Sequence, residues 1–186
     1  MNRRYFFRLP LVTAILASAR SSVASLTQAA SVLRERVLVK SGVDRYNKPF
    51  KYLDATFQVK VSGKDNEGRC VIFDTLRPEK VGPPLHLHTD CDEWFFVLGG
   101  EFKFKAGDEV LRLAVADSLL VPRNMPHTFV KTSEGTARLL LMHQPAGTME
   151  EFFRTGSQIT HQSAEERQTF VEKHGMRIVG PALTAD

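Results

Sequence analysis

The chain has 186 residues, of which 42% are hydrophobic, so it is long enough to bury one sizeable core. Its formal net charge of +4 comes from the N-terminus, because five arginines and no acidic residue precede Glu35. Without these five, the remaining 20 Lys and Arg residues face 21 acidic residues, which is a nearly neutral balance. The charge pattern therefore argues against a nucleic-acid partner, and the length predicts one compact domain.

Residues 1–24 have the features of an export signal. The adjacent Arg3 and Arg4 precede an aromatic pair and a further arginine, and an apolar stretch over residues 9–17 follows. This order resembles a twin-arginine signal that ends in small residues suited to cleavage. The apolar stretch is much shorter than the roughly 20 residues that span a bilayer, so we expect no stable membrane anchor.

Two alternatives to export remain open. The N-terminal segment is rich in Arg and Ser and lacks acids, as mitochondrial presequences do, or it is an ordinary extension of a cytoplasmic protein. We predict an exported, periplasmic protein in which residues 25–39 form an extension before the folded domain.

The middle of the chain alternates apolar and polar residues with the period of a β-strand. In residues 55–61, for example, Phe57, Val59 and Val61 fall on one face. About eight to ten short strands separated by turn residues predict an all-β antiparallel barrel or jelly roll over residues 40–145. The strands expected in chain order include 55–61, 69–76, 101–105, 110–113, 118–122 and 136–143.

The character of the sequence changes over residues 146–186, which are expected to be helical. Residues 148–154 have helical spacing, and Ser163 with Glu166 forms a capping box for a helix that Gly175 stops. Four apolar residues of this segment are expected to pack against the barrel, or alternatively to close one barrel end as a lid: Phe152, Phe153, Phe170 and Val171.

A metal site is predicted at His86, His88, Glu93 and His127. Residues i and i+2 of a strand point to the same face, so His86 and His88 project together. Each histidine alone is more often a core or surface residue than a ligand. Together, three imidazoles and one carboxylate form a typical ligand set for a divalent first-row metal, and iron, manganese, nickel, copper and zinc all suit it.

These residues resemble the first motif of the cupin superfamily. That motif reads His-x-His, four residues, Glu, six residues, Gly. It is met by His86, His88, Glu93 and Gly100. The motif usually opens with a glycine, but Lys80 stands at that place and the nearest glycine is Gly82.

The second cupin motif is also matched, with three departures. The matching residues are Asp117, Pro122 and His127. Ala116 and Asn124 stand where the family usually has glycine, and Lys131 stands where it often has Asn. Asn124 tolerates a positive φ, whereas Ala116 would be strained there. Lys131 is expected to alter the surroundings of the ligands or the pocket mouth.

The phrases around both motifs resemble single-domain cupins of the quercetin-dioxygenase-like group. This resemblance implies a metal-dependent dioxygenase-type oxidoreductase that acts on a small phenolic or enolic molecule. His86, His88, Glu93 and His127 would bind the metal, and Glu93 would also be the catalytic base. A homodimer is expected because cupins commonly pair.

Two other functions remain open: a metal-dependent isomerase or epimerase for a sugar or keto acid, and an exported barrel that binds a metal or ligand without catalysis. Phe95, Phe104 and Phe129 are candidate pocket walls, and Arg123 and Met125 are candidates for the pocket entrance. Three further histidines are left out of the site because they have no companions that resemble ligands: His143, His161 and His174.

The two cysteines, Cys70 and Cys91, match no zinc-thiolate spacing, and two positions cannot establish a disulfide. Each is expected to be a free thiol in the core or in a loop.

Overall fold

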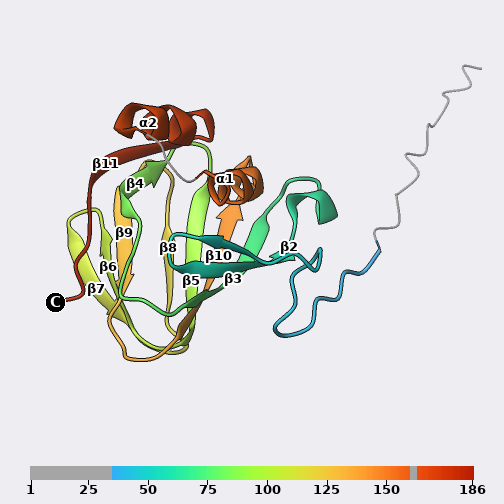
Figure 1. The fold of residues 1–186 in the computed structure, drawn as a ribbon, viewed down its shortest axis with the longest axis horizontal. Coiled ribbons are helices and arrows are strands. Elements are labelled where there is room, and N and C mark those ends of the chain that lie inside the picture. Colours follow the sequence, from blue (N-terminus) through green and yellow to red (C-terminus); the bar gives the residue numbers. More distant parts are fainter. Residues whose placement is uncertain (1–34, 160–162) are drawn as a thin grey trace, which may run out of the picture. The chain divides into compact units, whose positions relative to one another are not determined.

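The computed structural model describes residues 35–159 and 163–186. Two antiparallel sheets form a jelly-roll-like sandwich, with helices in the C-terminal part of the chain, as predicted (Figure 1). None of the helices in these residues is long and apolar enough to cross a membrane. The predicted export signal at residues 1–24 lies outside the described residues, as does most of the extension at 25–39.

In the part of the chain that the structure describes, eleven strands build the two sheets. One sheet contains β1 (Phe50–Tyr52), β2 (Ala55–Val61), β3 (Val71–Arg77), β5 (Asp92–Gly99), β8 (Ser118–Val121) and β10 (Ala137–Gln144). Its strand order is β1-β2-β3-β10-β5-β8. The other contains β4 (Pro84–His88), β6 (Phe102–Ala106), β7 (Glu109–Leu113), β9 (His127–Lys131) and β11 (Met176–Ala182). Its order is β11-β4-β9-β6-β7.

The period-two pattern locates the strands well. Strand β2 has the predicted bounds, and Phe57 and Val59 are buried. Val61 is only partly buried, because the pairing with β3 shifts register between Val59 and Val61. Such an irregularity displaces a side chain from the alternation, so the prediction of one common face fails at its last residue.

Strand β11 corrects the prediction of a wholly helical C-terminal segment. It pairs with β4, opposite the predicted ligands His86 and His88. The strand contains Gly180 and Pro181, and its pairing is irregular around Gly180. Glycine and proline usually mark turns, so the local sequence concealed this edge strand.

Helices α1 (Met149–Gly156) and α2 (Ala164–Lys173) lie at the same end of the sandwich (Figure 1). The capping box of α2 is confirmed: the Ser163 hydroxyl accepts a hydrogen bond from the Glu166 amide, and the Glu166 carboxylate accepts one from the Ser163 amide. Phe152 of α1 stacks on Phe170 of α2 with ring centres 5.3 Å apart. The two helices are therefore joined by aromatic packing above the barrel.

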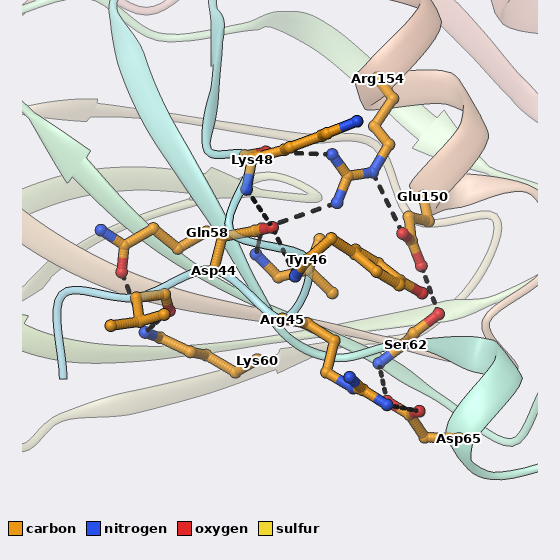
Figure 2. Close-up of polar contacts among 12 residues, drawn as sticks. Asp44, Arg45, Tyr46, Lys48, Gln58, Lys60, Ser62, Asp65, Glu150 and Arg154 are labelled. Carbon is orange, nitrogen blue, oxygen red and sulfur yellow. Dashed lines mark hydrogen bonds and ion pairs between the residues drawn. The ribbon is translucent and has the colours of Figure 1, made fainter. Parts of the chain in front are cut away.

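A polar network around Asp44 ties α1 to the barrel (Figure 2). The Asp44 carboxylate accepts hydrogen bonds from the backbone amides of Tyr46, Lys48 and Val59, at 2.9, 3.1 and 2.7 Å. Arg154 of α1 lies 3.6 Å from Asp44 and 3.1 Å from Glu150. Glu150 in turn accepts a 2.6 Å hydrogen bond from the Ser62 hydroxyl. The network holds in place the helix that carries Phe152 and Phe153.

Both residues that replace motif glycines adopt the left-handed conformation. Ala116 has φ 75° and Asn124 has φ 65°. Asparagine visits this region at low cost, whereas an alanine Cβ is crowded there. The structure confirms the expected strain at Ala116, in the turn that leads into β8.

We expect the substitution Ala116→Gly to raise the free energy of unfolding by about 0.5–1 kcal/mol, because glycine relieves the strain of a positive φ. Asn124→Gly is the matched control and should change stability less. Urea unfolding of the three proteins measures both effects. A loss of stability in Ala116→Gly would contradict the strained conformation.

Candidate metal centre

Strand β4 carries two of the predicted ligands on one face. His86 and His88 are buried, while Leu85 and Leu87, which alternate with them, are partly exposed. Strand β9 lies beside β4, with His127 directly opposite His86. The alternation of β4 and this register bring three imidazoles together from one sheet.

Gly82 permits the close approach of the segment before β4 to β9. A Cβ atom at Gly82 would lie 1.6 Å from the carbonyl oxygen of Phe129. No side chain fits at that distance, so glycine is required two residues from the usual motif position. The contact lies just before β4 and two residues after His127, so it helps to set the spacing of the histidines.

The carboxylate comes from the opposite sheet. Glu93 lies on β5, and its Oε2 atom is 3.0 Å from His88 Nε2 and 2.9 Å from His127 Nε2. With His86 included, one nitrogen or oxygen atom of each residue lies within 4.8 Å of those of the others. All four residues are at most 6% exposed. The structure thus brings the four predicted residues together between the two sheets.

Backbone carbonyls determine which nitrogen of two histidines faces the cluster. His86 Nδ1 lies 2.8 Å from the carbonyl oxygen of Pro84. His127 Nδ1 lies 3.0 Å from the carbonyl oxygen of Met125. A carbonyl oxygen only accepts hydrogen bonds, so both Nδ1 atoms carry the proton and donate it. In each neutral ring the Nε2 atom is then left with a lone pair, as a metal ligand requires.

The contact between His127 and Glu93 requires a cation. A neutral His127 would direct its Nε2 lone pair at a carboxylate oxygen 2.9 Å away, and two acceptors repel each other. A proton on His127 Nε2 would turn this repulsion into a hydrogen bond to Glu93. Burial lowers the pKa of His127, but the hydrogen bond and the charge of Glu93 outweigh burial and raise this pKa. A divalent metal would satisfy the same pair and the other two histidines at once. The four residues therefore fit a metal ion.

The pKa directions of His86, His88 and Glu93 favour the states that bind metals. Burial, together with the neighbouring His127 and His88, lowers the pKa of His86 to about 3. Burial also lowers the pKa of His88. Burial raises the pKa of Glu93, but the surrounding imidazoles, His143 first, outweigh it and hold the pKa well below its usual value. Neutral imidazoles and an ionised carboxylate are the forms that coordinate a metal.

His143 lies beside Glu93 of this cluster, a contact that the sequence analysis did not predict, although His143 is not one of the four candidate ligands. It lies opposite Glu93 in the pairing of β5 with β10, is fully buried, and places Nε2 3.2 Å from Glu93 Oε1. The alternation with the buried Leu139 and Leu141 was the available signal for its inward direction. His174 lies apart, with its Nδ1 atom 2.8 Å from the carbonyl oxygen of Phe170, and His161 lies outside the described residues.

A cavity of about 460 Å³ opens onto His86, His88 and Glu93. Its walls come from both sheets and both helices and are mainly apolar. The aromatic residues that line it are Tyr52, Phe57, Phe129, Phe152, Phe153 and Phe170. The aromatic residues of α1 and α2 thus pack on the barrel and also close this end of the cavity, which unites the two expected roles.

The predicted pocket walls are confirmed only in part. Phe129 lines the cavity, whereas Phe95 and Phe104 do not; they pack in the core with ring centres 4.9 Å apart. The expected entrance residues, Met125 and Arg123, do not line the cavity either. Arg123 forms an ion pair with Asp92, 3.0 Å away and at the surface.

Comparisons with known proteins identify one family match and several similar folds. Residues 72–143 match the family described as Cupin domain, and this range contains all the residues of the cluster. The comparison with curated proteins found no match. The fold is similar to that of a predicted oxalate decarboxylase from Thermotoga maritima, with 14% identity, a TM-score of 0.53, and coverage of 59% of this chain and 99% of that chain.

Two further solved structures are similar at lower scores. The polyketide cyclase RemF from Streptomyces resistomycificus has 19% identity and a TM-score of 0.49, over 59% of this chain and 79% of that chain. An RmlC-like cupin from Shewanella frigidimarina has 16% identity and a TM-score of 0.49, over 60% of this chain and 92% of that chain.

The fold is a cupin fold. The matched domain and the similar structure from Thermotoga maritima support the cupin superfamily. Identities this low establish a shared fold and carry no information on activity.

Lys131 does not shape the mouth of the cupin cavity. Its side chain is buried, and its ammonium group donates hydrogen bonds to the backbone carbonyls of Pro78 and Gly135. It therefore joins two loops and does not contact the ligands, in contrast to the expected influence on the site.

Both cysteines, Cys70 and Cys91, are free thiols. Cys91 is buried, and burial, followed by the charge of Glu93, raises the pKa of its thiol to about 12. A thiol with this pKa stays protonated at neutral pH and is a poor nucleophile.

We expect the double variant His86→Ala/His88→Ala to lose stoichiometric metal binding while its barrel remains folded, because two of four ligands are removed. Elemental analysis and circular dichroism measure the two properties. His174→Ala, outside the cluster, is the control and should keep its metal. Full metal content in the double variant would contradict the assignment of the ligands.

Proposed function

We propose that this protein is a metal-dependent oxygenase that acts on a small phenolic or enolic molecule. The observation that carries the proposal is the opening of a His3Glu cluster onto a cavity whose mainly apolar walls include six aromatic residues. The quercetin-dioxygenase-like phrases of the sequence support the same reaction class.

The cluster provides four protein ligands for the metal: Nε2 of His86 and His127, a ring nitrogen of His88, and a carboxylate oxygen of Glu93. A divalent metal with five or six coordination positions would supply Lewis acidity, a template for substrate and the capacity to activate dioxygen. Iron, manganese, nickel, copper and zinc all suit this donor set, and a redox-active one is needed for the proposed reaction.

The cavity suits a small aromatic substrate. Its volume of about 460 Å³ lies within the range of small-molecule sites, and its rings offer stacking and edge contacts to a planar ligand. Phe152 and Phe153 of α1 are buried and help to exclude water from the reacting end. Exclusion of water strengthens electrostatic interactions with Glu93.

Glu93 is the residue suited to move a proton. Its Oε2 atom faces His88 and His127, and its Oε1 atom lies 3.2 Å from His143 Nε2. We assign to Glu93 the acceptance of the proton from the phenolic or enolic hydroxyl of the bound substrate. We assign to His143 the role of a positioning residue in this scheme, because its imidazole lies beside the second carboxylate oxygen.

A second candidate, isomerisation of a sugar or keto acid, is favoured by one observation. Three cationic residues, Lys51, Arg77 and Arg167, also line the cavity. Cationic side chains suit an acidic substrate, and a metal acting as Lewis acid would not require oxygen.

Export to the periplasm and homodimer formation remain predictions. The outer face of the six-stranded sheet supports the dimer, because it carries the stacked rings of Trp94 and Phe96 beside the exposed Leu98 and Leu120. An apolar surface of this kind is commonly buried by association.

We expect the metal-loaded protein to consume oxygen with at least one member of a panel of flavonols, catechols and enols. Glu93→Gln should lower kcat about 10²- to 10⁴-fold, because it removes the proposed base. An oxygen electrode measures the rate, and exposed Glu101→Gln is the control. Equal turnover under argon would favour the isomerase, and the absence of any turnover would favour a binding protein.

A further inference from the structure

Arg77 at the end of β3 is a buried cation inside the proposed substrate cavity. Its exposed fraction is 3%, and it lines the cavity together with His86 and Glu93. Its guanidinium carbon lies 4.6 Å from the ring centre of Phe129 and 5.8 Å from that of Phe57. The aromatic rings position the guanidinium plane and leave its N–H edge for polar partners.

Few N–H groups of the Arg77 guanidinium have a hydrogen-bond partner in the described part of the chain. A guanidinium has five N–H donors. Within residues 35–159 and 163–186, Arg77 donates one hydrogen bond, from Nε to the Thr75 hydroxyl at 3.3 Å. A terminal nitrogen also lies 3.6 Å from Asp54 Oδ1, which is an ion pair but too long for a hydrogen bond. The Asp54 oxygens themselves have no hydrogen-bond partner among the described residues.

The charge of the cavity is complementary to an anion. Burial lowers the pKa of Arg77 to about 10, against the opposing effect of Asp54 and Glu93, so the guanidinium remains charged at neutral pH. Lys51 and Arg167 are further cationic residues of the lining. Among the described residues that line the cavity, Glu93 is the sole acid. A metal ion bound by the cluster would neutralise its negative charge. A positive, largely apolar cavity attracts and holds an anion with an apolar body.

We propose that the cavity binds a small apolar carboxylate, such as an aromatic carboxylic acid, whose carboxylate pairs with the terminal N–H groups of Arg77. Arginine matches a carboxylate with two parallel hydrogen bonds, which fixes the orientation of the bound molecule. The proposal rests on the proposed function only in taking this cavity as the substrate site. It narrows the substrate class to phenolic or enolic acids.

Calorimetric titration with benzoate and with benzyl alcohol tests the preference for a carboxylate. Benzyl alcohol has a similar apolar body without the charge. The protein as purified should bind benzoate at least about tenfold more tightly, the magnitude expected of hydrogen bonds to a charged group. The preference should persist in His86→Ala/His88→Ala, where a metal ion no longer contributes to it.

Two variants distinguish recognition by Arg77 from a structural role. Asp54→Asn should bind benzoate more tightly, because it removes the carboxylate that competes for the guanidinium. Asp54→Asn/Arg77→Gln should lose the preference for benzoate, and it removes both charges of this ion pair, so neither partner is left behind as an uncompensated buried charge. Arg112→Gln, on the exposed face of β7, is the control and should bind as the parent does.

Equal binding of benzoate and benzyl alcohol by the parent would overturn the proposal, as would a preference that survives in the double variant. The failure of the proposed function is distinguishable from this outcome. Carboxylate binding that depends on Arg77, without oxygen consumption by any substrate, would retain the anion site and reject the oxygenase. Oxygen consumption with neutral phenols alone, together with equal binding, would retain the oxygenase and reject the anion site.

Discussion

The contact of Glu93 with several histidines is the interaction on which the rest of the structure depends. A carboxylate buried between two sheets is stable only if its charge is compensated by hydrogen bonds or by a nearby cation. Here the compensating groups come from both sheets: His88 and His127 at 3.0 and 2.9 Å, and His143 at 3.2 Å. Because Nδ1 of His127 donates to a carbonyl, a cation between His127 and Glu93 is a requirement of the hydrogen-bond pattern.

The core and the helices shield the cluster from solvent, while the cavity leaves it open to a small molecule. Phe95 and Phe104 fill the sandwich interior as core, so the open space lies toward the end that α1 and α2 cover. The ion pairs and hydrogen bonds of Asp44 and Glu150 fix α1 there. The aromatic lining and the cationic Arg77 then define what enters: an apolar molecule with a negative group.

Local patterns in the sequence were enough to predict the sandwich and the four residues that cluster between its sheets. His86 and His88 share a face because they are two residues apart, and the motif spacing identified Glu93 and His127. His143 and Arg77 escaped detection because their roles arise from strand pairing and from a cavity whose walls lie far apart in the sequence. Strand β11 was missed for a different reason, since Gly180 and Pro181 imitate a turn.

The most direct test of a metal held by the two sheets is an anomalous difference map from crystals of the protein purified without chelator or added metal. We expect one peak between β4, β5 and β9, about 2.0–2.2 Å from a nitrogen of His86, His88 and His127 and from a Glu93 oxygen. A cluster without such a peak, even after soaking with divalent metals, would contradict the metal centre. The cation between His127 and Glu93 would then be a proton.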